Sequence, residues 1–532
     1  MKLPQSPLGW LKAKISGVDY FFVLRLGSCS PIPLAGPSGS PANLHSLRSY
    51  LRRLDMLNCD LLLINGVVID GSGQARREAS VAVKDGRIVG VGEALSYVAA
   101  KTIDLKGLAI APGFIDVHTH DDRLLLADPS MAAKVSQGAT TVITGNCGLS
   151  LAPLGQTEAI PPLNLIANGP SQRYETFADY FAALEKNPPA VNMAALLGHT
   201  TLRAVTMSDL ARPANNAEIA KMQILVQEAL DAGVVGVSTG LYYAPAQAAT
   251  AAEIQAVFEP LRGGTALIAS HIRNEAAQVL EAMTEAMSIA KELGVRQVLS
   301  HHKVNGQENF GRSRETLALV DQMRAQGDVC LDCYPYVASS TVLRQDTVEQ
   351  ASRTLIAWSK TKPETSGRYV DELLKEQDLS LTDFLASLQP AGAIYFSMDE
   401  DDVERILAYP ETMIGSDGLP HDTFPHPRLW GAFPRVLGHY SRDRKLFPLE
   451  TAVHKMTGLS AARFGLKDRG LIKEGYAADL VIFDPVSIKD SATFADPMRP
   501  AAGIHQVYVN GVLSWQDGVT THARAGQVLR RA

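Results

Sequence analysis

The amino-acid sequence predicts an α/β protein with a (β/α)8 TIM-like barrel and a small β-sandwich domain formed by both chain ends. The middle of the chain alternates continuous apolar runs with helical stretches, a pattern typical of buried parallel strands and the helices that cover them. Eight such runs favour a closed barrel over a doubly wound open sheet. The two chain ends carry short, strand-like runs instead.

Residues 1–56 form an N-terminal extension, which we expect to be disordered. It is rich in Lys and Arg and poor in acidic residues, and a Pro/Gly/Ser-rich stretch follows Ser30. A basic, acid-poor start is also typical of a transit peptide. We favour a disordered tail, or an upstream stretch before a natural start at Met56, because no signal-type apolar segment follows Arg52 and Arg53.

The predicted β-sandwich domain comprises residues 57–111 and 475–532. Turn signals such as Gly71-Ser72-Gly73 and Asn510-Gly511 separate its short strands. The strand-like runs are 60–70, 78–91 and 101–111 near the start, and 479–484 and 506–512 near the end. Because both chain ends share this pattern of short strands and turns, we expect them to form one domain.

The predicted catalytic barrel comprises residues 112–474. Its eight candidate strands lie at 114–120, 141–147, 193–199, 234–238, 266–271, 297–301, 329–334 and 413–417. Helical stretches lie between them, for example 217–232, 275–293 and 315–326. The seventh and eighth strands are unusually far apart, which predicts an insertion around 345–410 that helps to shape the active site.

Most of these candidate strands end in a residue that can bind a metal ion or move a proton. In a barrel, the carboxyl ends of the strands meet at one face, where active sites are built. The first strand ends in Asp116-Val117-His118-Thr119-His120. Residues at i and i+2 on a strand face the same side, so His118 and His120 can bind one metal together.

Four later strands add further candidate groups. Cys147 ends the second strand, His271 the fifth and Asp417 the eighth. At the sixth strand, His301 and His302 are adjacent and therefore point opposite ways. The residues themselves do not decide which of the two joins the site.

Imidazole, thiolate and carboxylate groups with an open position suit a catalytic zinc ion. Zinc lowers the pKa of bound water to about 7 and polarises a carbonyl group. A nearby carboxylate can accept the proton of that water and later protonate a leaving amine. This combination predicts the hydrolysis of an amide or a related bond.

The same residues resemble the amidohydrolase superfamily, through Gly-Phe-Ile-Asp-Val-His-Thr-His at 113–120, His at strands five and six, and Asp at strand eight. The resemblance is closer still to the D-aminoacylase (N-acyl-D-amino-acid deacylase) family. The matching segments are Thr144-Gly-Asn-Cys-Gly, Leu299-Ser-His-His-Lys, Asp332-Cys-Tyr-Pro-Tyr, 415–422 and 425–435. The resemblance runs from about Cys59 to the C-terminus.

The resemblance implies a role for each candidate metal ligand. Cys147, His271 and His301 would hold one tightly bound zinc ion. His118 and His120 would form a second, weaker metal position. A Cys in place of the carboxylated Lys that bridges two metals in many superfamily members argues against a hydantoinase or a dihydroorotase.

The resemblance also implies how the substrate is bound and cleaved. Asp417 would be the general base and acid for a metal-activated water, which would release a D-amino acid and a carboxylate from an N-acyl-D-amino acid. Arg428 would bind the α-carboxylate, because a planar guanidinium fits a carboxylate bidentately. Lys303, Tyr334 and Ser340 would assist it. The preference for the D hand comes from the resemblance alone.

The side-chain preference stays open at this point. Tyr242, Tyr395 and Met398 resemble pocket-lining positions of the family and indicate an apolar pocket. In contrast, Glu349 falls where an apolar residue is expected, and Arg344 could help to bind an acidic side chain. A deacylase specific for N-acyl-D-glutamate or N-acyl-D-aspartate is therefore an alternative, as is another amide or cyclic-amide hydrolase of the superfamily.

Composition limits the partners and the compartment. The net charge is −6 and no basic surface is implied, which argues against a nucleic-acid partner. No apolar run reaches the length of a membrane span. The five Cys are odd in number and few for the length, which favours a reducing, cytoplasmic location over a disulfide framework. The expected partner is a small-molecule substrate, and the sequence does not determine the oligomeric state.

Overall fold

The computed structural model describes residues 9–15, 18–24, 57–93, 95–157, 159–167 and 173–531. The chain divides into two units, Met1–Leu57 and Asn58–Ala532. In the first unit, β1 (Gly9–Ile15) and β2 (Val18–Leu24) pair in antiparallel fashion. The rest of the predicted extension lies outside the described residues, so its disorder stays a prediction.

Eight parallel strands form the centre of the second unit, and this confirms the predicted TIM-like barrel. Each strand is hydrogen-bonded to the next one along the chain. An isolated parallel bridge between Thr119 and Gly418 joins the two ends of this sheet, so the barrel is nearly closed. The strands are β8 (Phe114–Asp116), β9 (Ala139–Thr144), β10 (Asn192–Gly198), β11 (Gly236–Gly240), β12 (Leu267–His271), β13 (Gln297–Leu299), β14 (Val329–Cys333) and β18 (Thr412–Ile414).

Successive strand residues face the barrel interior and the surrounding helices in turn. Ile143 of β9 packs in the inner cluster with Leu196 and Val298, whereas its neighbour Val142 belongs to the outer layer. Phe464 of α17 (Gly458–Phe464) also joins the inner cluster. The interior is therefore a packed core, and an active site has room only at an open end of the strands.

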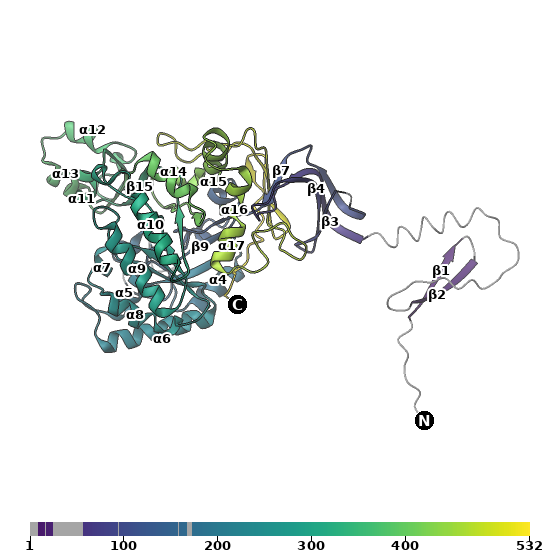
Figure 1. Cartoon of the computed structure of the whole chain (residues 1–532), viewed down its shortest axis with the longest axis horizontal. Coiled ribbons are helices and arrows are strands. Elements are labelled where there is room, and N and C mark those ends of the chain that lie inside the picture. The colour runs from purple at the N-terminus through teal and green to yellow at the C-terminus, as the bar shows by residue number, and fades with distance from the viewer. Residues whose placement is uncertain are drawn as a thin grey trace, which may run out of the picture. The chain divides into compact units, whose positions relative to one another are not determined.

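Helices cover the outside of this sheet (Figure 1). Local signals fix their ends: α6 (Asn216–Ala232) begins with a capping box from Asn215 and ends at Gly233 in the left-handed conformation. The predicted helices at 217–232, 275–293 and 315–326 correspond to α6, α9 (Val279–Leu293) and α10 (Ser313–Arg324). The others are α2 (Leu124–Ala127), α3 (Ala132–Val135), α4 (Phe177–Lys186), α5 (His199–Thr206), α7 (Ala244–Gln247), α8 (Ala251–Val257), α15 (Arg428–Arg435) and α16 (Leu449–Met456).

A β-rich domain from both chain ends is also confirmed. Its strands are hydrogen-bonded into one nine-stranded sheet, in which the two ends meet where β7 (Ala109–Pro112) pairs with β19 (Leu480–Phe483). Leu63, Ile110 and Leu480 share its hydrophobic core. The remaining strands are β3 (Leu57–Val68), β4 (Arg77–Lys84), β5 (Arg87–Gly92), β6 (Tyr97–Asp104), β20 (Ile504–Val509), β21 (Val512–Gln516) and β22 (Val519–Thr520).

The long segment between β14 and β18 is a small subdomain of its own. Its three strands form an antiparallel sheet in the order β15-β17-β16. The elements are β15 (Ala338–Val342), α11 (Gln345–Gln350), β16 (Arg353–Ser359), α12 (Val370–Lys375), α13 (Leu381–Leu388), β17 (Ala391–Phe396) and α14 (Glu400–Ala408). In Figure 1, α11, α12 and α13 lie at the end of this unit that is far from β3, β4 and β7.

Candidate active site

The strand ends bring together all six residues that the sequence singled out for metal binding and proton transfer. Each residue is the last of its strand or follows it within a few positions, and each is buried, with at most 8% of its surface exposed. They are His118 and His120 after β8, Cys147 after β9, His271 at the end of β12, His301 after β13 and Asp417 after β18.

The first group of candidate ligands consists of Cys147, His271 and His301. The Sγ atom of Cys147 lies 3.3 Å from Nε2 of His301, which lies 3.1 Å from Nδ1 of His271. These separations suit donors that share one zinc ion at its usual distances of about 2.0–2.3 Å. His302 is excluded from the group because its Nε2 lies 2.8 Å from the hydroxyl oxygen of Thr316 on α10.

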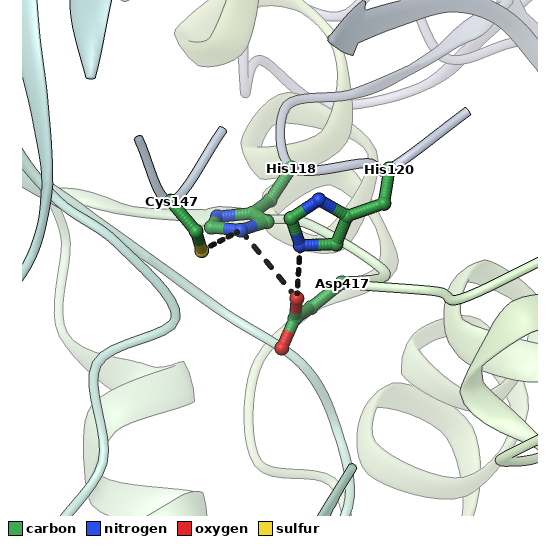
Figure 2. Close-up of side chains that lie close together, drawn as sticks. All are labelled: His118, His120, Cys147 and Asp417. Atoms are coloured by element: carbon green, nitrogen blue, oxygen red, sulfur yellow. Dashed lines mark hydrogen bonds and ion pairs between the residues drawn. The ribbon is translucent and has the colours of Figure 1, made fainter. Parts of the chain in front are cut away.

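The second group consists of His118, His120 and Asp417, and it shares Cys147 with the first. Figure 2 shows the two imidazole rings facing one oxygen of Asp417. Oδ1 of Asp417 lies 3.5 Å from Nε2 of His118 and 3.2 Å from Nε2 of His120. Nε2 of His118 is also 3.2 Å from Sγ of Cys147. The thiol of Cys147 therefore lies between two adjacent metal-binding positions.

Three of these residues have a left-handed backbone. The φ angles are 54° at Cys147, 36° at His301 and 49° at Asp417. Residues other than Gly seldom adopt this conformation, and where they do the strain is often found at functional sites. Each of the three follows a barrel strand, so the turn that directs its side chain into the cluster carries backbone strain.

The charges of the cluster favour ionised ligands. Burial opposes ionisation of the Cys147 thiol, yet the imidazoles of His118 and His301 hold its pKa well below the usual value. Burial likewise opposes ionisation of Asp417, and the guanidinium of Arg428 holds the pKa of that carboxyl well below its usual range. A thiolate and a carboxylate at this position attract a cation.

Glu275 is a part of the site that the sequence analysis did not assign. Its Oε1 atom lies 3.2 Å from Nδ1 of His301 and 3.6 Å from Nε2 of His271, the ring nitrogens that face away from the shared metal position. The side chain of Asn274 accepts hydrogen bonds from two following backbone amides, and α9 begins only at Val279. Glu275 is thereby kept out of the helix that was predicted to begin with it.

Asp332 of β14 is a second unassigned carboxylate. Its Oδ1 atom lies 3.4 Å from Nδ1 of His118 and accepts a hydrogen bond of 2.9 Å from the backbone amide of His301. One side chain thus orients a residue from each group. A carboxylate at the outer nitrogen of a metal-binding imidazole fixes the tautomer and the direction of the ring.

The substrate-side candidates form a buried group of donors next to Asp417. Nη2 of Arg428 lies 2.9 Å from Oδ2 of Asp417 and donates to the carbonyl of Ser340 at 3.1 Å. Nε and Nη1 of Arg428 and the hydroxyls of Tyr334 and Ser340 are buried and have no hydrogen-bond partner among the described residues. Donors left in this way are costly unless a ligand satisfies them.

Unlike these donors, the ammonium group of Lys303 has hydrogen-bond partners. Its Nζ atom lies 2.6 Å from Oε1 of Glu275 and 2.8 Å from Nδ1 of His301. Burial lowers the pKa of Lys303, but the adjacent Glu275 more than compensates, so that the pKa is raised. In this structure Lys303 supports the cluster as well as facing the cavity.

A cavity opens above the cluster, and Tyr242 is the predicted pocket residue that lines it. The ring of Tyr242 is stacked on that of His271 with 5.2 Å between centroids. Tyr395 and Met398 are not among its lining residues: the hydroxyl of Tyr395 is hydrogen-bonded to the backbone of Val342, and Met398 belongs to the hydrophobic core. The lining residues are His120, Leu165, Tyr242, Tyr243, His271, Glu275, His301, Lys303, Asn305, Ser339, Ser340, Thr341, Thr347, Asp417 and Leu419.

With this geometry in place, comparisons with known proteins are informative. Residues 101–514 match the model of an amidohydrolase family. A D-aminoacylase from Alcaligenes xylosoxydans xylosoxydans is 55% identical over 89% of this chain and 98% of its own length.

Two solved structures extend the comparison. One is a D-aminoacylase whose binuclear metal centre is described with one-metal activation and second-metal attenuation, with TM-score 0.87 and 54% identity over 89% of this chain and 100% of that one. The other is the N-acyl-D-glutamate deacylase of Bordetella bronchiseptica with zinc and a phosphonate inhibitor, with TM-score 0.84 and 44% identity over the same shares. Within the described part of this chain, no helix is long and apolar enough to cross a membrane.

Proposed function

The chain belongs to the amidohydrolase family, and on that premise we propose that it is a zinc-dependent hydrolase of N-acyl-D-amino acids. The reaction cleaves the amide bond and releases a D-amino acid and a carboxylate. One observation carries the proposal: buried donors of Arg428, Tyr334 and Ser340 without partners among the described residues lie beside the metal-binding cluster. A carboxylate-binding position thus lies next to a metal-binding position.

The donor set of the cluster fits the proposed zinc. Cys147, His271 and His301 are the ligands of the tight ion, since thiolate and imidazole are its preferred protein ligands. His118 and His120 form the second, weaker position, and the zinc in the solved N-acyl-D-glutamate deacylase supports the choice of ion. When bound, zinc supplies a Lewis acid that activates a water molecule and polarises the scissile carbonyl.

Asp417 is the proposed proton carrier. Its Oδ2 is held by Arg428, while Oδ1 faces the two imidazoles of the second group. Because its pKa lies well below the usual range, the carboxylate is ionised before the reaction and can accept the proton of the attacking water. It then returns that proton to the amide nitrogen as the amine leaves.

The hand of the substrate follows from two fixed points. Arg428 would hold the α-carboxylate and the metal position would hold the acyl carbonyl. With these two points fixed, the two enantiomers direct their side chains differently, so the shape of the cavity wall can select one of them. The relatives named as D-aminoacylase and N-acyl-D-glutamate deacylase support the D hand. The unpaired, buried Cys59, Cys330 and Cys333 support the proposed cytoplasmic location.

A chiral hydrolysis assay tests this function. The purified full chain, loaded with zinc, is incubated with the N-acetyl derivatives of D- and L-methionine and D- and L-glutamate. We expect turnover of at least one D compound, little turnover of its L form, and loss of activity after chelation that zinc restores. Turnover of neither D compound by protein that binds zinc would refute the substrate assignment.

A further inference from the structure

We propose that Asp346 sets the substrate class of this site: by neutralising Arg344 it restricts the side-chain pocket to neutral N-acyl-D-amino acids. The inference rests on the proposed deacylase function and deepens it. Overall sequence similarity does not distinguish neutral from acidic substrates. A D-aminoacylase and an N-acyl-D-glutamate deacylase both align over nearly nine-tenths of the chain. The charges around the cavity distinguish the two substrate classes.

Three cations lie in or next to the cavity wall, and each has a carboxylate partner. Lys303 lines the cavity, Arg428 contacts the lining residues Asp417 and Ser340, and Arg344 contacts the lining residue Tyr242. Lys303 is bound to Glu275 at 2.6 Å, and Arg428 is bound to Asp417 at 2.9 Å. The third pair is Arg344 with Asp346. A substrate with one α-carboxylate needs one cation with donors to spare, and a substrate with an acidic side chain needs a second.

Arg428 has donors without a partner, whereas Arg344 donates to Asp346 through two of its nitrogens. Nε and Nη1 of Arg428 lack partners among the described residues. In contrast, Nε of Arg344 donates to Oδ1 of Asp346 at 3.0 Å, and Nη2 donates to Oδ2 at 2.5 Å. This arrangement uses both carboxylate oxygens and one of the two guanidinium edges that can bind an acid bidentately, and it neutralises the charge of Arg344.

The position of Arg344 makes this pairing relevant to substrate choice. Its guanidinium carbon lies 4.9 Å from the centre of the Tyr242 ring, and Tyr242 lines the cavity. The hydroxyl of Tyr242 lies 3.0 Å from that of Thr347, another lining residue on the same short helix as Asp346. Arg344 therefore lies directly behind a residue of the cavity wall.

Apart from the metal-binding cluster and the pair of Lys303 and Glu275, the cavity lining is uncharged. Thr347 and Tyr242 present hydroxyls, and Leu165 and Leu419 present apolar groups. Glu349, the acidic residue found where an apolar one was expected, is engaged by the side chain of Gln345 at 2.8 Å and is absent from the cavity lining. An acidic substrate side chain would lose water here without gaining a cation that is free of a carboxylate partner, and this cost disfavours its binding.

The test compares substrate preference in the wild type, Asp346→Asn, the double variant Arg344→Met/Asp346→Asn, and Glu349→Gln as the matched control. For each zinc-loaded full chain, kcat/KM is measured with N-acetyl-D-methionine and N-acetyl-D-glutamate. The readout is the ratio of the glutamate value to the methionine value. Asp346 is exposed, so its substitution leaves the core intact, and circular dichroism verifies the fold of each variant.

We expect the wild type to favour N-acetyl-D-methionine and Asp346→Asn to raise the ratio by about tenfold or more, since one charged hydrogen bond contributes about that factor. The double variant should return to the wild-type ratio, and Glu349→Gln should not change it. A wild type that favours the glutamate compound, or a ratio unmoved in Asp346→Asn, overturns the inference while leaving deacylation intact. Turnover of neither compound overturns both proposals.

Discussion

Asp417 and Arg428 form a buried ion pair, with Oδ2 and Nη2 2.9 Å apart. The pair connects two proposed tasks, because Asp417 moves the proton and Arg428 binds the α-carboxylate. A substrate carboxylate that engages Arg428 also competes for the charge that holds the pKa of Asp417 low. Binding of the correct substrate should thus make Asp417 a stronger base at the moment when a base is needed.

Replacing Arg428 by Lys should impair binding of carboxylate substrates. The variant keeps a positive charge beside Asp417 but loses the planar fork, so we expect kcat/KM for an N-acetyl-D-amino acid to fall by about 10- to 100-fold. Steady-state kinetics measures this. The matching N-acetyl amine without a carboxylate is the control substrate, and an equal loss on both would argue against a role in carboxylate binding.

Replacing Asp417 by Ala should separate catalysis from metal binding. We expect the tight zinc to remain, since its three proposed ligands are Cys147, His271 and His301, and turnover to fall by roughly 100- to 10,000-fold because the proposed proton carrier is lost. Elemental analysis and single-turnover kinetics measure the two effects. Near-normal activity in this variant would refute the proposed mechanism.

Replacing Cys147 by Ala should remove the tight zinc. The thiol is common to both groups of ligands, so no other side chain in the cluster takes its place. Zinc content after dialysis against a mild chelator should fall below the wild-type value in this variant. Cys330→Ala, which changes a buried Cys in the barrel core away from the cluster, is the control and should keep its zinc. Equal zinc content in both variants would contradict the assignment.

Replacing Glu275 by Gln should weaken zinc binding without removing a ligand. Its carboxylate orients His301 and His271 through their outer nitrogens, and loss of such a partner typically costs about 10- to 100-fold in metal affinity. Competition with a fluorescent chelator measures the affinity independently of activity. Glu285→Gln, which changes a carboxylate paired with Arg273 outside the cluster, should leave the affinity unchanged.

The buried pair of Arg203 and Glu253 predicts a pH-dependent part of the stability. Burial opposes ionisation of Glu253, yet the nearby imidazole of His199 and hydrogen bonds from the Ala214 amide and Arg203 lower its pKa to about 2 from 4.5. A depressed carboxyl pKa stabilises the fold above the unfolded value of 4.5, and this contribution is lost as the pH falls toward 2.

Glu253→Gln should therefore lower the free energy of unfolding at pH 7 by about 3–5 kcal/mol, the usual cost of breaking a buried pair. The difference from the wild type should shrink below pH 4.5. Urea unfolding at pH 7, 5 and 4 measures it, with the exposed Glu228→Gln as the control. A difference that grows toward acid pH would contradict this linkage.

Local pattern was sufficient for the barrel and for most of the metal site. Continuous apolar runs are typical of parallel strands, and the strands of a barrel end at one face, so His118, Cys147 and Asp417 could be placed together before any contact was known. The alternation of side chains along a strand also showed that only one of His301 and His302 could join them. The packing of His302 against α10 then settled which one.

The sequence did not predict the role of residues that depend on a partner far away along the chain. Glu275 was read as the first residue of a helix, and only the folded loop brings it to two imidazoles from different strands. Tyr395 and Met398 were predicted as pocket residues, whereas Tyr395 packs in the core of the subdomain between β14 and β18 and Met398 packs in the large hydrophobic core. Arg344 was considered as a group that could help to bind an acidic side chain, and the structure pairs it with Asp346 at the start of α11.

The sequence by itself thus determined the fold class, the candidate metal ligands and the class of reaction, because these follow from periodicity and from residue types at strand ends. Only the tertiary structure decided which charges are neutralised, which donors stay unsatisfied and which side chains face the cavity. The physical reason is range: a strand or a helix is specified by neighbours a few residues away, whereas an ion pair or a pocket wall depends on elements that folding brings together.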